Sequence, residues 1–565
     1  MIITEFSKDI QVRLLDDLVK VFPDEAPMAS VEPVSLSVLR DDRLSFQIAF
    51  SGRLSEPEQP GHFPTRFAQI TVSSPVSDWI TVREVICVPC EYPAHADSDD
   101  NYLRKNPGLY PDLLRPVEAG IIPITDNRWS AVWIDAETPA DCIPGRYPLE
   151  ICLSDPRTSE KLLILALEIN VLSFTLPSQL FPRTEWFHAD CLADYYHVPV
   201  FSEEHWAILR SFIAAAVRRG INMILVPQFT PPLDTGVGRE RTTVQLVDVF
   251  SDEGVYRFDF SKLRRWIGMC LECGVRYFEM SHLFSQWGAV AAPKIEGYVG
   301  SVRRRIFGWD TPATGSDYTS FLRAYLPQLR AVLRECGIED RTYFHISDEP
   351  HLDQMKSYRA AKESIRDLLG GCRFLEALSD YEFYKHGLIE HPVCATDHID
   401  AFLQAETPGL WSYYCTSQSK NVSNCFIAQP SGRTRIYGLQ LYKFGIEGSL
   451  RWGYNFYNSA FSYYPVNPFL STDCGRVMPS GDPFLVYPGP GGVPQESIRM
   501  LVLDDAIRDL RALKALEEKI GRKKTIAILD EGLITPLTFD RYPRYPEDAP
   551  YVLRLRRQVN QMLCE

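Results

Sequence analysis

Residues 205–229 read HWAILRSFIAAAVRRGINMILVPQF, and this stretch sets the fold expectation for most of the chain. From His205 to Gly220 the apolar residues recur as on one face of an amphipathic helix, and Gly220 is a typical residue just beyond a helix end. The apolar run from Ile221 to Phe229 follows at once and is typical of a buried strand. A helix that leads directly into a strand is the repeating unit of parallel α/β folds.

The same unit recurs along the chain. Helices are predicted at residues 260–274, 318–337 and 353–371, and strands follow them at residues 275–284, 341–347 and 373–380. Further strands are predicted at residues 183–192, 391–400, 410–416 and 448–456. About eight strands over roughly 330 residues predict a (β/α)8 TIM-like barrel. An open doubly wound sheet is the runner-up, but no glycine-rich phosphate loop follows any of these strands.

The beginning of the chain follows a different pattern. Apolar and polar residues alternate with period two over residues 44–52, 66–74, 79–88 and 128–137, and Pro and Gly turns separate these runs. This predicts an N-terminal antiparallel β-sandwich over residues 1–176. The barrel then spans residues 177–520, and a C-terminal extension, residues 521–565, is expected to pack on it.

Composition excludes several classes of function. The chain has 59 Lys plus Arg against 73 Asp plus Glu, a net charge of −14, whereas proteins that bind nucleic acid usually carry a basic excess. The best apolar run, residues 162–172, is too short to span a membrane and contains Glu168. The N-terminus has no signal-peptide pattern, so we expect a cytoplasmic protein. The Cys87/Cys90 and Cys270/Cys273 pairs lack partners at zinc-site spacing and are interpreted as packed thiols.

In a barrel of this type, function lies at the carboxyl ends of the strands. The segment HISDEPH, residues 345–351, is a strand that runs out into Asp348 and Glu349 before a helix. The other Asp-Glu pairs of the chain lie in turn-like segments. Adjacent acids repel, so one of the two tends to stay protonated near neutral pH, which suits a general acid beside a charged partner.

Neighbouring carboxyl groups are poorly placed for the usual cleavage of a glycosidic bond, because that reaction needs one carboxyl group on each side of the sugar. They suit the exception, in which a 2-acetamido sugar attacks its own anomeric carbon with its carbonyl oxygen. One carboxylate then orients the acetamido group, and the other protonates the leaving oxygen.

Several segments carry a resemblance to a known family. They are HISDEP (residues 345–350), LYKFGIEGSLRWGYNFYNS (residues 441–459), GDPFLVYPG (residues 481–489) and SIRMLVLDDAIRDLRALKALEE (residues 497–518). In these the chain resembles glycoside hydrolase family 123 and the related domain of unknown function 4091. The resemblance covers roughly residues 180–520. It implies a β-sandwich joined to a catalytic barrel, and an exo-β-N-acetylgalactosaminidase activity that retains configuration by substrate assistance.

Carried onto this chain, the resemblance makes Glu349 the general acid/base and Asp348 the group that stabilises the oxazolinium-like intermediate. The implied substrate is a glycan or glycoconjugate with a terminal β-linked N-acetylhexosamine, with GalNAc as the preferred sugar. The mechanism requires no metal and no cofactor. A homo-oligomer is compatible with the sequence.

Other residues near predicted strand ends are candidates to bind the sugar, and each also has a structural interpretation as a packing or hydrogen-bonding residue. Trp452 and Tyr454 are expected on one side of the last strand, and one of Tyr413 and Tyr414 must face inward. The candidates are His188, His282, Trp287, Tyr413, Tyr414, Trp452, Tyr454 and Asn455.

Two alternatives remain open from the sequence. The first is a glycosidase of the same fold that acts on another sugar, and aryl glycosides without the acetamido group would separate it from the main hypothesis. The second is a carbohydrate-binding protein without catalysis, against which the intact Asp348-Glu349 pair argues.

Overall fold

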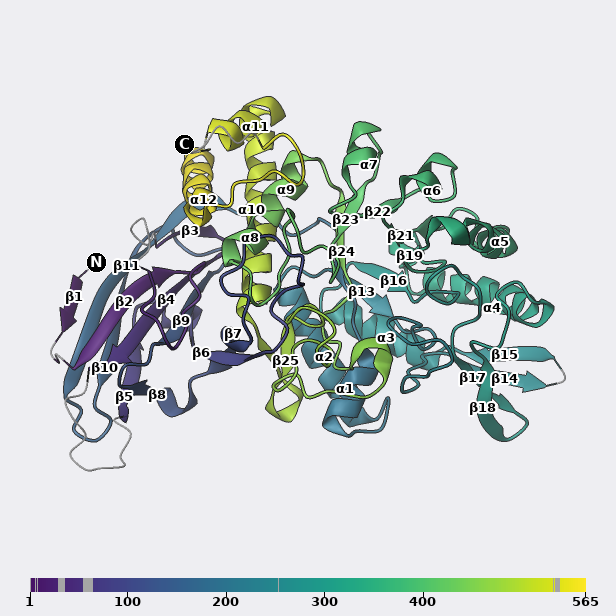
Figure 1. The fold of residues 1–565 in the computed structure, drawn as a ribbon, viewed down its shortest axis with the longest axis horizontal. Helices are drawn as coiled ribbons and strands as arrows, with labels where there is room; N and C mark the ends of the chain where they lie inside the picture. The colour runs from purple at the N-terminus through teal and green to yellow at the C-terminus, as the bar shows by residue number, and fades with distance from the viewer. Residues whose placement is uncertain are drawn as a thin grey trace. The chain divides into compact units, whose positions relative to one another are not determined.

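The computed structural model describes residues 1–565 except 1, 6, 8, 29–35, 54–64, 253, 532 and 534–538. The chain forms two compact units. Figure 1 shows the fold, coloured by residue number from the N-terminus to the C-terminus. The first comprises Met1–Gln179, Ser423–Lys443 and Gln495–Glu565, and the second comprises Leu180–Val422 and Phe444–Pro494. Residues 423–443 and 495–520, which we expected within the barrel span, therefore belong to the first unit, as does the C-terminal segment. The expected boundaries of independently folding domains stay predictions.

The first unit contains two β-sheets. In the five-stranded sheet all neighbours are antiparallel, in the order β2 (Ile10–Asp16), β4 (Asp42–Gly52), β9 (Ser130–Thr138), β6 (Ile80–Cys90) and β7 (Gly108–Pro116). The six-stranded sheet has the order β1 (Ile2–Glu5), β11 (Lys161–Thr175), β10 (Gly145–Ser154), β5 (Thr65–Ser73) and β8 (Ile121–Thr125). Its sixth strand, β3 (Ser37–Arg40), pairs with β11 in parallel.

Both sheets contribute to one hydrophobic core. Phe46 and Ile134 of the five-stranded sheet cluster there with Ile151 and Leu165 of the six-stranded sheet, and all four are fully buried. Because strand side chains alternate between the faces of a sheet, the period-two pattern of the sequence supplies one apolar face per strand to this core. The N-terminal part is thus β-rich, as expected.

Helix α10 (Ile498–Ile520) covers the other face of the five-stranded sheet. Its first turn is capped by Ser497, whose hydroxyl accepts a hydrogen bond from the backbone of Met500 at 3.1 Å. A second core cluster joins the helix to the strands through Ile498, Leu501, Val502, Leu15, Ala49 and Trp133. Strand β4 is therefore buried along its whole length, on both faces. The remaining helices of this unit are α8 (Ser431–Arg435), α9 (Tyr437–Lys443), α11 (Arg522–Glu531) and α12 (Ala549–Cys564).

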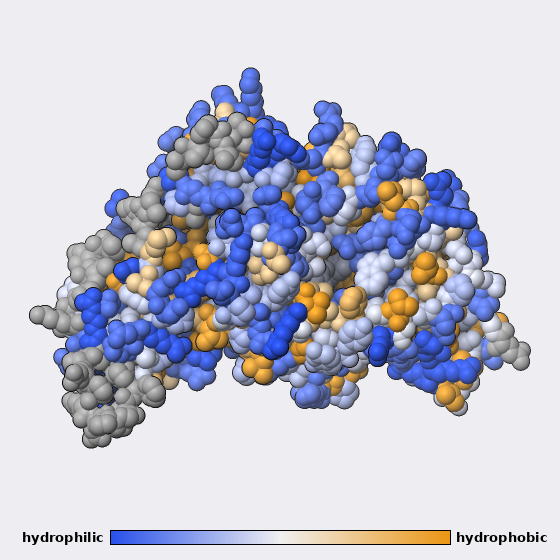
Figure 2. Space-filling model, viewed as in Figure 1, coloured by the Kyte–Doolittle hydropathy of each residue, from blue (hydrophilic) through white to orange (hydrophobic). Residues whose placement is uncertain are grey.

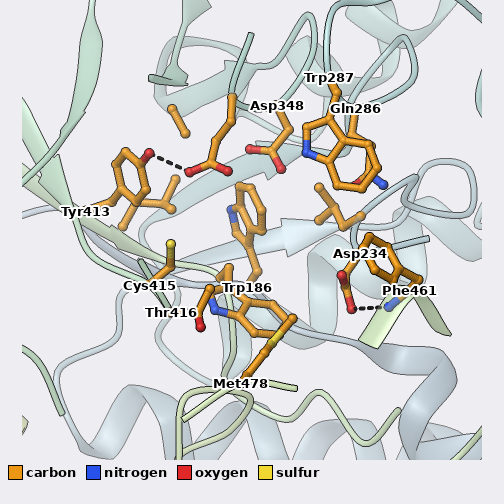
Figure 3. A pocket seen from close by; sticks show the side chains of 15 residues that line it. Trp186, Asp234, Gln286, Trp287, Asp348, Tyr413, Cys415, Thr416, Phe461 and Met478 are labelled. Carbon is orange, nitrogen blue, oxygen red and sulfur yellow. Dashed lines mark hydrogen bonds between the residues drawn. The ribbon is translucent and has the colours of Figure 1, made fainter. Parts of the chain in front are cut away.

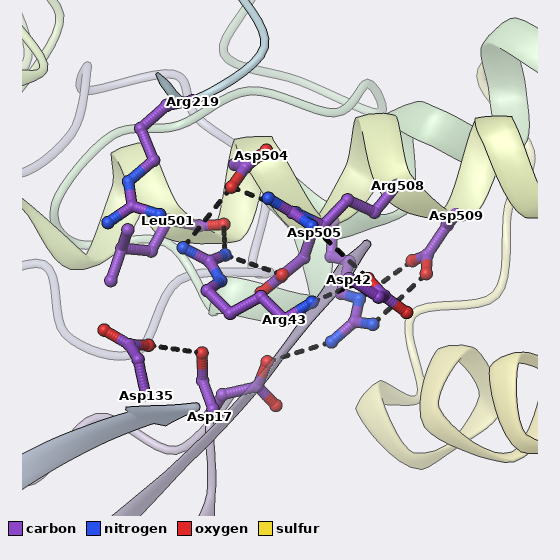
Figure 4. Close-up of polar contacts among 12 residues, drawn as sticks. Asp17, Asp42, Arg43, Asp135, Arg219, Leu501, Asp504, Asp505, Arg508 and Asp509 are labelled. Atoms are coloured by element: carbon purple, nitrogen blue, oxygen red, sulfur yellow. Dashed lines mark hydrogen bonds and ion pairs between the residues drawn. The ribbon is translucent and has the colours of Figure 1, made fainter. Parts of the chain in front are cut away.

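Buried ion pairs fasten α10 to the strands, as Figure 4 shows. The Arg43 guanidinium donates to the carbonyl oxygen of Leu501 and to Oδ1 of Asp505, both at 2.6 Å, and lies 3.4 Å from Oδ2 of Asp504. Burial alone would lower the pKa of Arg43, but the carboxylates of Asp505 and Asp504 hold it above its ordinary value. The buried cation is thus matched by buried anions.

The same network extends along the helix. Arg435 on α8 donates to Asp509 at 2.8 Å and to Asp17 at 2.9 Å, and Arg556 on α12 donates to Asp509 at 2.8 Å. Burial and neighbouring carboxylates raise the pKa of Asp17 to about 8, even though Arg435 opposes the shift. Helices α8, α10 and α12 of the first unit are therefore joined by shared aspartates.

The second unit is organised around a nine-stranded parallel sheet that forms a nearly closed barrel. Its order is β20 (Arg373–Phe374), β19 (Thr342–Phe344), β16 (Tyr277–Met280), β13 (Met223–Val226), β12 (Arg183–Glu185), β24 (Gly448–Arg451), β23 (Trp411–Tyr413), β22 (Pro392–Ala395) and β21 (Glu376–Leu378). The two end strands, β20 and β21, are separated in sequence by Leu375 alone, whose backbone N–H donates to the carbonyl of Phe344 at 3.0 Å. The two edges of the sheet are thus consecutive parts of one chain segment.

Each strand expected from the sequence is present in this barrel, but each is shorter than expected. The last one illustrates the difference, because β24 ends at Arg451 and not at Phe456. Only part of each apolar run pairs with a neighbour, and the residues after that part leave the barrel in a loop or a helix. The alternation expected for Trp452 and Tyr454 was therefore wrong, since neither residue lies in a strand.

Helices connect these strands along the chain. They are α1 (Ala189–Tyr196), α2 (Glu203–Arg218), α3 (Ser261–Glu272), α4 (Ser316–Glu335), α5 (Met355–Ile365), α6 (Tyr381–Lys385) and α7 (Asp400–Gln404). Gly220 follows α2 with a φ of 76°, which confirms the predicted helix end. A separate four-stranded sheet has the order β15 (Val255–Asp259), β14 (Asp248–Asp252), β17 (Ile295–Val299) and β18 (Val302–Phe307). Two short strands, β25 (Val486–Pro488) and β26 (Pro494–Glu496), follow β24.

The face of the molecule in Figure 2 is mainly hydrophilic, with scattered apolar groups. Single exposed apolar residues are normal on a protein surface. Among the described residues, no helix combines the length and the apolar character that a membrane crossing needs.

We expect Arg43→Met to lower the free energy of unfolding of the first unit by about 3–5 kcal/mol, because it leaves Asp505 buried without its cation, whereas Asp504 keeps Arg508 at 3.2 Å. Urea unfolding of the full chain measures this loss. The control is Arg146→Ala, which removes an exposed ion pair with Glu168 and should cost about 1 kcal/mol or less. Equal effects of the two substitutions would contradict the role given to the buried network.

Candidate active site

A cavity of about 230 Å³ opens among the loops that follow the barrel strands. Pockets for drug-sized ligands usually measure about 300–1,000 Å³, so this one suits a smaller ligand such as a single sugar ring. It lies within the second unit and is drawn in Figure 3. Its lining consists of Trp186, Leu233, Asp234, Gln286, Trp287, Asp348, Glu349, Ala377, Tyr413, Cys415, Thr416, Leu450, Trp452, Phe461 and Met478.

Asp348 and Glu349 open into this cavity together. In Figure 3, Asp348 faces the cavity beside the carboxyl group that Tyr413 contacts. That contact is a hydrogen bond of 2.5 Å from the Tyr413 hydroxyl to Oε1 of Glu349. The backbone N–H of Trp287 donates to the carbonyl oxygen of Asp348 at 2.9 Å, which ties the acidic pair to the loop after β16.

The backbone around the cavity is strained. Glu349 has a φ of 41°, and three other lining residues, Asp234, Trp287 and Phe461, have φ values of 37°, 56° and 56°. Residues other than glycine adopt this left-handed region at a cost of order 1–3 kcal/mol, and such residues gather at functional sites. Four of them around one cavity indicate that the loops were selected for the position of their side chains.

Burial raises the pKa values of both acids. The pKa of Asp348 lies well above its ordinary value, and the negative charges of Glu349, Glu376 and Glu279 add to the effect of burial. Burial also raises the pKa of Glu349, although the hydrogen bond from Tyr413 opposes the shift. When two carboxyl groups interact, the two apparent pKa values describe the pair and cannot be assigned to one residue each. The pair therefore retains one proton at pH values where exposed acids have lost theirs.

Two of the indole rings that line the cavity, those of Trp186 and Trp452, follow neighbouring barrel strands. Trp186 follows β12, and its ring N–H donates to Oε1 of Glu279 at 2.7 Å. Trp452 follows β24, and its ring N–H donates to Oδ2 of Asp482 at 3.0 Å. Because each N–H is held by a carboxylate, each ring is fixed in orientation. The two rings offer apolar surface to a ligand held by the acidic pair.

Glu279 is the centre of a buried network beneath Trp186. The hydroxyl of Thr184 donates to its Oε2 at 2.6 Å, and Nε2 of His345 lies 2.6 Å from its Oε1. Glu376, on the end strand β21, accepts from the backbone of Ile346 at 3.2 Å and from the Tyr358 hydroxyl at 2.7 Å. Burial raises the pKa of Glu376 to about 7. This layer supports the floor of the cavity and adds negative charge below Asp348.

The same buried layer could instead bind a metal ion, because His282, His345 and Glu376 bring three ligand atoms within 4.8 Å of one another. The two imidazole rings are stacked, with centroids 4.4 Å apart and 28° between their planes. The lone pairs of stacked rings lie in nearly parallel planes, whereas tetrahedral ligation needs them to converge on one point. The residue types suit zinc, but this arrangement would hold it only after one ring had turned.

Asp234 and Phe461 form the wall opposite the acidic pair, as Figure 3 shows. The backbone N–H of Phe461 donates to Oδ2 of Asp234 at 3.1 Å. Burial raises the pKa of Asp234 to about 6, although Arg241 opposes the shift. Gln286 lines the same side and donates to the carbonyl of Thr235 at 2.9 Å. A carboxyl group at this wall can accept hydrogen bonds from sugar hydroxyls.

Of the residues predicted from the sequence, five line the cavity and five do not. Those in the lining are Asp348, Glu349, Trp287, Tyr413 and Trp452. Of the neighbouring tyrosines, Tyr413 is thus the one that faces the cavity. Those outside the lining are His188, His282, Tyr414, Tyr454 and Asn455, all of which are buried.

His188 and Asn455 support the site from behind. Asn455 accepts from the backbone N–H of His188 at 2.9 Å and donates to its carbonyl at 3.1 Å. Arg241 donates to Nδ1 of His188 at 3.1 Å, so the ring proton is on Nε2, which donates to the carbonyl of Trp452 at 2.9 Å. Burial, and secondarily Arg241, lower the pKa of His188 to about 3. The neutral ring therefore holds the backbone of Trp452.

The other predicted residues outside the lining also have structural roles. The Tyr454 hydroxyl donates to the carbonyl of Phe212 at 3.0 Å, and its ring stacks on Phe187. His282 is buried against Trp186, with ring centroids 5.2 Å apart, and neither of its ring nitrogens has a hydrogen-bond partner among the described residues. Burial lowers the pKa of His282 well below its ordinary value. A direct contact with substrate stays a prediction for these residues, and their positions do not favour it.

Sequence reasoning missed Trp186, Asp234, Gln286, Cys415, Thr416, Phe461 and Met478 in the lining. Trp186 lies inside the first predicted strand, residues 183–192, but the strand ends at Glu185, so the rule that selects strand ends missed Trp186 because the strand end was placed too late. Asp234 and Met478 lie outside the helices and strands, and Phe461 lies in a three-residue 3-10 turn, so no periodic signal places these side chains.

Comparisons with known proteins agree with this architecture. The model of the glycoside hydrolase 123 catalytic domain matches residues 186–516. A solved structure of a family 123 glycoside hydrolase from Clostridium perfringens, studied for glycolipid glycan hydrolysis, has a TM-score of 0.71 and 15% identity, covering 98% of each chain. A search of curated proteins gave no match.

Weaker structural matches include two β-glucuronidases. One, from Bacteroides uniformis, has 11% identity and a TM-score of 0.28, over 85% of this chain and 48% of that chain. The other, from Ruminococcus gnavus, has 9% identity and a TM-score of 0.30, over 88% of this chain and 68% of that chain. TM-scores this low support no inference about the fold or function of this chain.

The Clostridium perfringens structure, at 15% identity, supports the fold alone. The family model, in contrast, spans more than half of the chain and includes the strand end with Asp348 and Glu349. This chain therefore belongs to glycoside hydrolase family 123 and is a glycoside hydrolase.

Proposed function

We propose that this glycoside hydrolase is an exo-β-N-acetylhexosaminidase that prefers terminal β-linked N-acetylgalactosamine and retains configuration through the 2-acetamido group of its substrate. One observation carries the proposal: two consecutive carboxyl groups open together into a small cavity lined by indole rings. At the finer level of fold, we also propose an antiparallel β-sandwich joined to a (β/α)8 barrel. The cytoplasmic location stays a prediction.

The position of the acids favours substrate assistance. The usual mechanisms place two carboxyl groups on opposite sides of the sugar, at least 5 Å apart. Asp348 and Glu349 are neighbours in sequence and both line the cavity. A nucleophile that belongs to the substrate removes the need for a carboxylate on the far side.

The reaction then has two steps. In the first, the acetamido carbonyl oxygen attacks the anomeric carbon, Glu349 gives its proton to the glycosidic oxygen, and the leaving group departs. Asp348 accepts a hydrogen bond from the acetamido N–H and stabilises the cationic oxazolinium ring. In the second step, Glu349 removes a proton from water, the water oxygen attacks the same carbon, and the acetamido group is restored. Two inversions give net retention.

Substrate binding also decides which acid carries the shared proton. The acetamido N–H is a donor, so it favours Asp348 as the carboxylate and leaves the proton on Glu349. We propose that Tyr413, whose hydroxyl donates to Glu349 without ligand, donates instead to the acetamido carbonyl once the sugar is bound. The fixed rings of Trp186 and Trp452 suit the acetamido methyl group and the apolar face of the sugar.

The charge of the lining favours a neutral sugar. It includes three carboxyl groups, from Asp234, Asp348 and Glu349, and no Lys or Arg among the described lining residues. A uronic or sialic acid would place a fourth carboxylate among them without a cation. The family relative was studied for glycolipid glycan hydrolysis. We extend that substrate class, a glycolipid or related glycoconjugate, to this chain as part of the proposal.

We expect Glu349→Gln to lower kcat/KM by about 10²- to 10⁴-fold on a disaccharide with terminal β-N-acetylgalactosamine, because proton transfer to the leaving oxygen is lost. The loss should be smaller on the 4-nitrophenyl glycoside, since nitrophenolate leaves without a proton. The control is Glu363→Gln, an exposed carboxyl group on α5 that should keep full activity. An unchanged rate in Glu349→Gln would contradict the assignment of Glu349 as the general acid.

We expect Asp348→Asn to lower kcat by roughly 10²- to 10³-fold, because the cationic intermediate loses its carboxylate. A thiazoline analogue of the intermediate should inhibit the wild type strongly and this variant weakly. Inhibition constants measured for both proteins test this. Equal inhibition would argue against participation of Asp348, and no inhibition of the wild type would argue against participation of the acetamido group.

The raised pKa values predict the pH profile. Below the upper apparent pKa of the pair, Glu349 keeps the proton that it donates, and above it activity falls. This alkaline limb should lie above the ordinary glutamate value of 4.5, because burial raises the pKa of Glu349. In Asp348→Asn the neighbouring negative charge is gone, so the limb should move to lower pH. Measurement of kcat/KM from about pH 4 to about pH 9 decides this, and an unmoved limb would contradict the coupling.

A further inference from the structure

Three aromatic rings lead from the cavity to the surface. Trp287 and Phe461 both line the cavity, and their ring centroids are 6.0 Å apart at an interplanar angle of 74°. Phe461 in turn lies 6.1 Å from Tyr463 at 67°. Exposure increases outward, because Trp287 is half-buried, Phe461 is 40% exposed and Tyr463 is 57% exposed. We call these three residues the aromatic rim.

The rim is held in place by a second loop. The backbone N–H of Phe461 donates to Asp234, the Ser462 hydroxyl donates to the Asp234 carbonyl at 2.7 Å, and Gly236 donates to the Phe461 carbonyl at 3.1 Å. The guanidinium of Arg239 lies over the Tyr463 ring, 5.1 Å from its centroid. The rings are therefore exposed but fixed, as a preformed binding surface requires.

This arrangement has costs that a merely structural loop would avoid. Phe461 and Ser462 both have left-handed backbones, with φ values of 56° and 54°. Exposed aromatic rings give up the apolar burial that would otherwise stabilise the fold. Strain and exposure together at the mouth of a catalytic cavity indicate a surface kept for a ligand.

We propose that the aromatic rim is a second sugar subsite, which stacks the pyranose next to the scissile bond in the leaving group. This inference rests on the proposed function, in which the cavity holds only the terminal sugar. The unit bonded to that sugar must then lie at the mouth of the cavity, where Phe461 and Tyr463 are exposed. A pyranose has an apolar face for the rings and hydroxyl groups for their polar neighbours.

A lipid chain is the competing occupant, because Val237 and Val477 near the rim are also exposed, at 75% and 52%. The sugar is favoured for two reasons. The Arg239 guanidinium stacks on Tyr463 and interrupts the apolar surface, and Asp234 holds the loop between the cavity and the rim. Mixed aromatic and charged surfaces suit ligands with both apolar faces and hydroxyl groups.

The test compares two substrates that differ only in the leaving group. One is a disaccharide in which β-N-acetylgalactosamine is linked to a second pyranose, and the other is the β-fluoride of the same sugar, which has no ring to stack. Tyr463→Ala should lower kcat/KM on the disaccharide by roughly three- to tenfold and leave the fluoride unchanged. Tyr463→Phe keeps the ring and should behave as the wild type.

The control is Phe67→Ala on β5, an aromatic residue of similar exposure, 55%, which should change neither substrate. An equal loss on both substrates, or no loss on either, would overturn the second subsite. Sedimentation of the wild type with neutral phosphatidylcholine vesicles, lost in Tyr463→Ala while the disaccharide rate is kept, would overturn it in favour of a lipid. If the wild type hydrolyses neither substrate, the proposed function itself fails.

Discussion

Extended backbone turns neighbouring side chains to opposite faces, so two consecutive carboxyl groups can share a cavity only where the chain leaves the strand conformation. Glu349 makes this change with its φ of 41°, five residues after β19 ends at Phe344. A left-handed backbone costs about 1–3 kcal/mol at a residue other than glycine. The contacts of the flanking residues offset it, since Trp287 donates to the Asp348 carbonyl and Ser347 donates to Glu376. The proposed chemistry depends on this one turn.

The sequence predicted where the barrel strands begin better than where they end. An apolar run marks a strand, but it does not distinguish residues that pair in the barrel from apolar residues in the loop beyond it. Helix α10 shows another limit, because its apolar residues predict a helix without indicating which sheet it covers. Its aspartates are buried against arginines that come from distant segments, such as Arg43 and Arg435, and no local pattern indicates those partners.

The same limit, that a local sequence pattern does not report contacts with distant segments, explains which residues of the site could be predicted. Asp348, Glu349 and Tyr413 follow or end short strands, and their place in the cavity could be predicted from the direction of a parallel barrel. The alternation rule failed one residue past β24, where Trp452 turns into the cavity while Tyr454 turns to the carbonyl of Phe212. Asp234 and Phe461 depend on a contact between two loops more than 200 residues apart, and no local pattern contains that information.

The buried carboxyl groups that hold α10 in the first unit and those beneath Asp348 in the second unit have different partners. In the first, Asp504, Asp505 and Asp509 each face an arginine, so the charges are neutralised in pairs and stabilise the fold. In the second, Glu279 and Glu376 lie beneath Asp348 and raise its pKa, and their side-chain partners are Thr184, His345 and Tyr358 rather than an arginine. An arginine in that layer would stabilise the barrel, but it would also lower the pKa of the acidic pair and release its proton. The burial of Glu279 and Glu376 without an arginine is thus unfavourable for stability, but it keeps a transferable proton on the acidic pair.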